Sequence, residues 1–170
     1  MTRPTDTEFA PYYGNYISLV PEGDIVETLL EQVAYFRGVL DGIAEADACV
    51  LHEPYTWTIK QAVGHMIDVE RVFAYRALHW ASADQRPLTG MEQDDWVEAT
   101  DWQSPTLAQL AEELELCRRS NVCMFRRLTD DAWSRGGEAD GNFMSVRGAA
   151  YCLAGHILHH TEIVKARTSS

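Results

Sequence analysis

Four segments of the sequence repeat apolar residues at alternating spacings of three and four, which is the period of an α-helix that buries one face. The first segment shows the pattern most clearly, with apolar residues at Val26, Leu29, Val33, Phe36, Leu40 and Ile43. No segment shows a convincing alternation of apolar and polar residues typical of a strand. We therefore predict an all-α fold, a bundle of four helices that bury their apolar faces against one another.

Each predicted helix opens with a residue type that caps helix N-termini. The predicted starts, in chain order, are Asp24, Thr58, Ser104 and Ser145. Glu27 stands three residues after Asp24, as a capping box requires, and Pro105 follows Ser104 at the first helical position, where its missing N–H costs no hydrogen bond. The buried seam of the third helix is predicted to contain Leu107, Leu110, Leu114, Cys117, Asn121, Met124 and Leu128.

About 20 residues, 84–103, separate the second and third predicted helices, whereas antiparallel neighbours usually need roughly 2–8. A connection this long can cross the bundle, so that the two helices run parallel. It carries Trp96 and Trp102, which we expect to pack over the bundle.

Three histidines occupy seam positions that would otherwise be apolar. His156 and His160 lie four residues apart on the fourth helix, about 5–6 Å between Cβ atoms, which suits two imidazoles that share one metal ion. His65 holds the equivalent position on the second helix. His159 lies about 100° around the helix from His160 and off the seam.

A glycine precedes two of these histidines, in "VGHMI" around His65 and "AGHIL" around His156. A glycine inside a helix costs about 1 kcal/mol relative to alanine. Its presence in both helices indicates a packing purpose, such as room for a neighbouring helix, a cofactor or a substrate.

A single histidine on an apolar face is more often a core residue than a metal ligand, and an H-x-x-x-H pair is evenly balanced between the two. Three together favour a metal, because buried imidazoles need partners and resist protonation side by side. Asp68, one turn after His65, could orient that imidazole, although a solvated surface carboxylate fits as well. The H-E-x-x-H signature of metalloproteases is absent, since Ile157 replaces the glutamate.

Other residues are candidates for lining a cavity beside the cluster, though some could equally cover the bundle surface. They are Arg71, Tyr75, Arg147, Tyr12 and Tyr13. Asp68, Arg147 and Tyr75 are the candidates for a catalytic role, and no residue is predicted to bind an organic cofactor.

The charge balance limits the partners. Lys plus Arg is 14 against 26 Asp plus Glu, a formal net charge of −12 that repels nucleic acids and anionic membranes. No segment has the apolar length of a membrane span, and the four cysteines form no C-x-x-C pair. We expect one domain over residues 1–170, with 1–23 as an N-terminal extension packed on the bundle, and a cytoplasmic location.

Three stretches carry a resemblance to a known family: "PYYGNYISLVPEGD", "YTWTIKQAVGHMIDVERVFAYRAL" and "SVRGAAYCLAGHILHH". Together they resemble the DinB superfamily of DinB/YfiT-like metalloproteins. The resemblance implies a bundle in up-down-down-up order and a divalent metal, commonly nickel or zinc, held by His65, His156 and His160. It also implies a homodimer.

The activity implied by the resemblance is less specific. Some relatives are thiol transferases that use bacillithiol or mycothiol, one is a mycothiol-dependent isomerase, and others are described only as metal-dependent hydrolases. Our leading hypothesis is a thiol-S-transferase that activates a low-molecular-weight thiol at the three-histidine site and acts on a small-molecule substrate. The alternatives are a hydrolase that uses metal-bound water and a non-catalytic, metal-stabilised dimeric binding protein.

Overall fold

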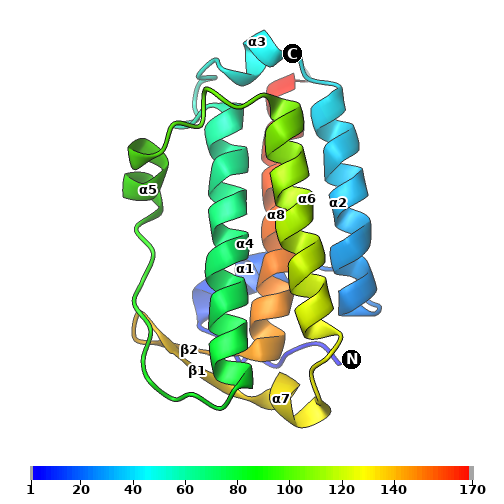
Figure 1. Ribbon diagram of the computed structural model, residues 1–170, viewed down its shortest axis with the longest axis vertical. Coiled ribbons are helices and arrows are strands. Elements are labelled where there is room, and N and C mark those ends of the chain that lie inside the picture. The colour runs from blue at the N-terminus through cyan, green and yellow to red at the C-terminus, as the bar shows by residue number, and fades with distance from the viewer. Residues whose placement is uncertain (1, 169–170) are drawn as a thin grey trace.

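Four long helices lie side by side in a computed structural model that describes residues 2–168, which confirms the predicted four-helix bundle (Figure 1). They are α2 (Ile25–Asp41), α4 (Ile59–Ala81), α6 (Leu107–Phe125) and α8 (Val146–Thr168). The colours of Figure 1 show that α2 and α8 run upward in that view, whereas α4 and α6 both run downward. The connection between α4 and α6 therefore returns along the length of the bundle. None of the helices within residues 2–168 is long and apolar enough to cross a membrane.

Shorter elements lie in the connections and were not predicted. The helical ones are η1 (Pro11–Tyr13), α1 (Gly14–Ile17), α3 (Glu45–Ala48), α5 (Gln93–Ala99) and α7 (Asp130–Ser134). The strands β1 (Gly136–Ala139) and β2 (Asn142–Ser145) form an antiparallel hairpin, so the expectation of no strand was wrong here. Each strand has only four residues, too few to show an alternation, but the Asp140–Gly141 turn between them, with φ of 54° and 69°, is a hairpin signal.

The predicted helix starts are correct for three of the four long helices. The carboxylate of Asp24 accepts hydrogen bonds from the amides of Val26 and Glu27. The Glu27 side chain makes an ion pair with Arg126 and does not complete the predicted capping box. Thr58 caps α4, and Ser145 directly precedes α8.

The third predicted start, at Ser104, was wrong by two residues. Thr106 is the N-cap of α6, and it forms a reciprocal capping box with Gln109 that satisfies two backbone N–H groups at once. The Ser104 hydroxyl donates to Asp101 and caps no helix. Pro105 consequently stands outside the helix, one residue before its N-cap.

The predicted seam of α6 is offset by one position beyond Leu114, where Cys117 and Met124 are only partly buried against the core. The buried residues there are Arg118, Val122 and Phe125, one position later than the predicted Cys117, Asn121 and Met124. Arg118 was not part of the predicted seam, and a charged residue is rarely buried alone. In the structure it has partners inside the core.

Arg118 joins all four long helices. Its guanidinium pairs with Glu70 of α4 and donates to the Leu29 carbonyl and the Gln32 side chain of α2 and to the Leu153 carbonyl of α8. Arg118 is 1% exposed and Glu70 2%. The bundle is therefore fastened at its centre by a buried ion pair with further hydrogen bonds, in addition to apolar packing.

The two glycines beside the histidines make room for other parts of the chain. A Cβ on Gly64 would lie closer than 3.0 Å to the indole ring of Trp102, and a Cβ on Gly155 would lie closer than 3.0 Å to the backbone of Tyr16. The packing purpose predicted for them is present, and the neighbours are a tryptophan and the short helix α1. Trp102 is buried as expected, whereas Trp96 is 42% exposed.

We predict that Gly155→Ala destabilises the protein by about 1–3 kcal/mol, because α1 must move away from α8 to admit the methyl group. Denaturant unfolding gives the size of the loss, and limited proteolysis should detect a loosened N-terminal segment. Gly38→Ala is the matched control. Gly38 lies in α2 with nothing within 4 Å of an added Cβ, so the same substitution there should stabilise by about 0.5–1 kcal/mol. Equal effects of the two variants would contradict this account.

Candidate metal centre

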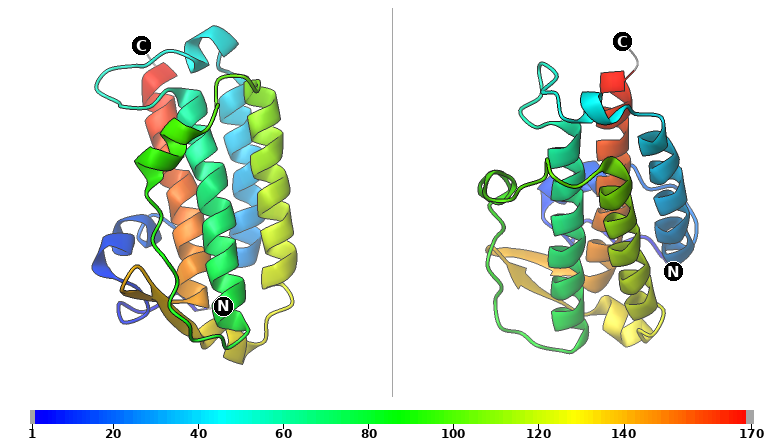
Figure 2. Two further views of the ribbon diagram at one scale, coloured as in Figure 1. Left: turned by 60° about the vertical axis from the view of Figure 1, so that its left-hand side comes forward. Right: turned by 45° about the horizontal axis from the view of Figure 1, so that its top comes forward.

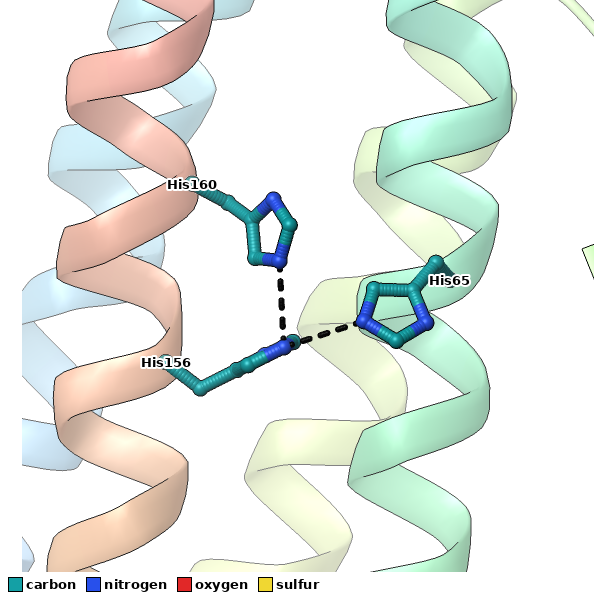
Figure 3. Close-up of side chains that lie close together, drawn as sticks. All are labelled: His65, His156 and His160. Carbon is teal, nitrogen blue, oxygen red and sulfur yellow. Dashed lines mark hydrogen bonds between the residues drawn. The ribbon is translucent and has the colours of Figure 1, made fainter. Parts of the chain in front are cut away.

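The imidazoles of His65, His156 and His160 converge between α4 and α8 (Figure 3). The Nε2 atom of His156 lies 3.1 Å from Nε2 of His65 and 3.1 Å from Nε2 of His160. One nitrogen from each ring lies within 4.8 Å of the other two. The structure thus brings together the three residues that the sequence singled out.

Aromatic side chains hold two of the rings in place. The Trp57 ring packs on His65 at 4.9 Å between centroids, and the Tyr16 ring packs edge-on against His156 at 5.4 Å. All three histidines are buried, with exposures of 3%, 7% and 8% for His65, His156 and His160. Their position is therefore fixed by packing before any ligand is considered.

Burial keeps the three imidazoles neutral. It lowers the pKa of His65 to about 4. It also lowers the pKa of His156 and His160 well below the usual range, and the neighbouring histidines reinforce this effect. At neutral pH each ring therefore has one nitrogen lone pair available, the form in which histidine ligates a metal.

The three imidazoles cannot satisfy one another's hydrogen bonding. The Nδ1 atoms of His65 and His160 are buried and have no partner within the described residues. A neutral imidazole has a single proton, so placing the protons on Nδ1 leaves the Nε2 lone pairs facing one another. Separations of 3.1 Å allow neighbouring Nε2 atoms to reach one ion at about 2.0–2.1 Å. The residues fit a divalent metal, and its binding stays a prediction.

Two cavities reach the cluster. The larger, of about 490 Å³, is lined by His65, His156 and Arg76 and is called the Arg76 cavity below. The second, of about 400 Å³, is lined by His160 and Arg167 and is called the Arg167 cavity. Gln93 and Asp94 of α5 line both. The left view of Figure 2 shows α5 in front of α4 and α8.

The three residues predicted as catalytic candidates do not contact the imidazoles. Asp68 pairs with Arg71 at 3.6 Å and makes no hydrogen bond to His65 Nδ1, so of the two readings left open for it the structure favours the carboxylate that does not orient the imidazole. Burial raises the pKa of Asp68. Arg147 forms an ion pair with Glu8 that holds the N-terminal segment at the start of α8. Tyr75 is 58% exposed.

The remaining predictions for cavity-lining residues had mixed outcomes. Tyr12 and Tyr13 line the Arg76 cavity as expected. Arg71 and Tyr75 line a separate cavity that includes Trp96 and none of the three histidines.

Several residues at the cavities were missed in the sequence. Arg76 follows the seam of α4, and Arg167 follows the same seam of α8 as His156 and His160, so helical spacing could have found both. Trp57 lies in a loop, and Gln93 and Asp94 begin the short helix α5, so neither segment gives a sustained periodic signal. Only the tertiary fold places these residues at the cavities.

Comparison with known proteins agrees with this architecture. The family model of the DinB superfamily matches residues 28–164. The structure of YfiT from Bacillus subtilis, described as a probable metal-dependent hydrolase with an unusual four-helix bundle topology, is similar with a TM-score of 0.78 and 16% identity, over 98% of this chain and 91% of YfiT. A mycothiol-dependent maleylpyruvate isomerase is similar with a TM-score of 0.67 and 13% identity, over 86% of this chain and 61% of that chain. A search among curated proteins finds no match. At these identities the two structural likenesses show the fold alone.

Proposed function

The chain belongs to the DinB superfamily, and from that membership and its site we propose that it is a metal-dependent enzyme, most consistent with a thiol-S-transferase. His65, His156 and His160 would hold a divalent ion, nickel or zinc. The observation that carries the proposal is the access to the cluster. One cavity reaches His65 and His156, and another reaches His160, so two reactants can approach the same three nitrogens from different sides.

When bound, a divalent ion held by three neutral ligands supplies a positive charge that favours the deprotonated form of a thiol. The chain's own residues do the rest. The rings of Trp57 and Tyr16 keep the imidazoles oriented and exclude water from their faces. The Arg76 cavity would hold an electrophile while sulfur forms its new bond to carbon, the leaving group departs with the bonding electrons, and the thiol proton passes to solvent.

The experiment loads purified, tag-free protein with zinc or nickel and adds a low-molecular-weight thiol and monochlorobimane. We expect the thiol to be alkylated, with release of chloride, faster than in the absence of protein. The added rate should disappear with EDTA and in a His65→Gln variant. If no thiol tested is consumed in a metal-dependent way, the transferase reaction is wrong.

A hydrolase is the second candidate, and one observation favours it. The carboxylates of Glu92 and Asp94 line the Arg76 cavity beside His65 and His156, where one of them could take a proton from water. Asp68, the base considered from sequence, does not line this cavity. Hydrolysis of p-nitrophenyl acetate by the metal-loaded protein, lost in Asp94→Asn or in Glu92→Gln, would favour this reaction over thiol transfer.

A purely structural metal has less support, because structural sites are closed and these imidazoles face two cavities. A homodimer, a cytoplasmic location and a small-molecule thiol as partner stay predictions.

A further inference from the structure

Arg167 is a buried cation with no anionic partner among residues 2–168. It is 9% exposed, and no carboxylate in residues 2–168 forms an ion pair with it. Its Nη1 donates to the Trp57 carbonyl at 2.8 Å, and its guanidinium carbon lies 3.9 Å from the centre of the Tyr55 ring. Its Nε is buried and has no hydrogen-bond partner.

Burying the Arg167 guanidinium in this way costs free energy unless an anion binds to it. An unpaired guanidinium in a buried position loses hydration, and only one of its N–H groups is matched by a backbone carbonyl in this structure. Stacking on Tyr55 and a hydrogen bond with the Tyr55 side chain offset part of this loss. The remaining donors suit a carboxylate, which a guanidinium can bind with two parallel hydrogen bonds.

Arg167 and the histidine cluster border the same cavity. Arg167 follows His160 by seven residues on α8, which puts both on one face of the helix and about 10 Å apart along it. A molecule of this length could contact both ends of the Arg167 cavity at once. Tyr55 and Trp57 also line this cavity.

The charge around the two cavities distinguishes them. The Arg76 cavity is lined by four carboxylates, those of Glu92, Asp94, Asp95 and Asp140. Of these, only Asp94 also lines the Arg167 cavity. Arg76 itself donates to the Thr89 carbonyl and borders Tyr13. An anionic group is therefore better accommodated beside Arg167 than beside Arg76.

We propose that the Arg167 cavity binds a carboxylate-bearing low-molecular-weight thiol, with its carboxylate on Arg167 and its sulfur toward His160. This identifies the substrate class of the proposed function and rests on it for the role of the sulfur. The carboxylate site itself is independent of the reaction, because it depends only on the guanidinium and the cavity.

Two measurements test the two parts separately. The first titrates octanoate, which has a carboxylate but no sulfur, into metal-free protein by calorimetry. The second measures the alkylation of a thiol by monochlorobimane with the zinc-loaded protein. It compares KM for 8-mercaptooctanoate with KM for its neutral amide, 8-mercaptooctanamide. We expect Arg167→Gln to weaken octanoate binding by about 10- to 100-fold and to raise KM for the acid by a similar factor. KM for the amide should change less than about twofold.

Arg76→Gln is the matched control, a buried arginine of the other cavity, and it should leave octanoate affinity unchanged. Arg167→Lys keeps a positive charge and should give an intermediate affinity, which provides a second reading should Arg167→Gln prove unstable in a melting curve. Octanoate binding that does not depend on Arg167, or that is lost in Arg76→Gln, overturns the proposal. If octanoate binding depends on Arg167 but no thiol is alkylated, the carboxylate site stands and the transferase reaction falls.

Discussion

Replacing His156 with leucine is expected to lower the affinity for zinc or nickel by at least about 100-fold. His156 is central to the cluster, since its Nε2 lies 3.1 Å from Nε2 of both other histidines. Without it the two remaining nitrogens come from different helices, and an ion would lose one of three protein ligands. Removing even an indirect partner of a metal ligand costs about 10- to 100-fold, so losing a ligand should cost at least as much.

The stability of His156→Leu should respond to zinc differently from that of the original protein. A metal that binds only the folded state adds about 2.7 kcal/mol when it is present at 100 times its dissociation constant. We therefore expect the melting temperature of the original protein to rise on addition of zinc and that of His156→Leu to stay unchanged. In the metal-free proteins, His156→Leu should melt at the same or a higher temperature, because it replaces a buried imidazole with an apolar side chain.

His159→Gln is the control, since His159 belongs to the same helix, is exposed and lies outside the cluster. Metal content after dialysis, measured on tag-free protein, should match the original in this variant and fall to background in His156→Leu. An original protein that retains no divalent ion, or a His156→Leu variant that retains as much as the original, would refute the metal centre.

The apolar periodicity predicts the four long helices because their burial pattern is local in sequence. It failed where burial depends on a distant partner. The register of α6 beyond Leu114 could not be predicted, since Arg118 enters the core only because Glu70 lies opposite it on α4. The start of α6 was misplaced because Ser104 and Thr106 are both good N-cap residues, and only Thr106 has a glutamine three positions later.

The three histidines could be predicted for the same reason as the helices, since each occupies a seam position. The surroundings of the cluster could not. Trp57 packs on His65 from a loop, and Asp94 lines both cavities from the short helix α5. Asp68 was chosen by its distance of one turn from His65, but at that position its carboxylate pairs with Arg71. Sequence spacing shows on which face of a helix a residue lies. It does not show which part of the chain packs against that face.

Replacing Arg118 with leucine is expected to destabilise the protein by about 3–5 kcal/mol, a large share of the stability of an ordinary domain. The reason is the charge left behind. Glu70 is 2% exposed and would lose its guanidinium partner, retaining only the amide of Asn121 at 2.8 Å. Glu70→Leu should be similarly harmful, because it leaves Arg118 charged among backbone carbonyls. Urea denaturation measures both losses.

The double variant Arg118→Leu/Glu70→Leu separates the cost of an unpaired charge from the value of the pair. It should lose less than the sum of the single losses by about 2 kcal/mol or more, because neither charge is then buried alone. Arg119→Leu is the surface control. Arg119 pairs with Glu115 on the same helix while its side chain is 62% exposed, and its loss should cost less than about 1 kcal/mol.

The network should also affect the metal centre, because Arg118 donates to the Leu153 carbonyl and Gln32 to the Ala154 carbonyl, both within one turn of His156. These bonds fix α8 against α2 and α6, whereas His65 stands on α4, which Glu70 fixes to α6. If either set of bonds is lost, the helices can move apart and the imidazoles with them. We therefore expect the folded fraction of Arg118→Leu to bind zinc more weakly. If the losses of the two single variants simply add in the double variant, neither charge depends on the other for its stability in the core. If zinc affinity is also unchanged in all three variants, the ion pair does not position the metal site.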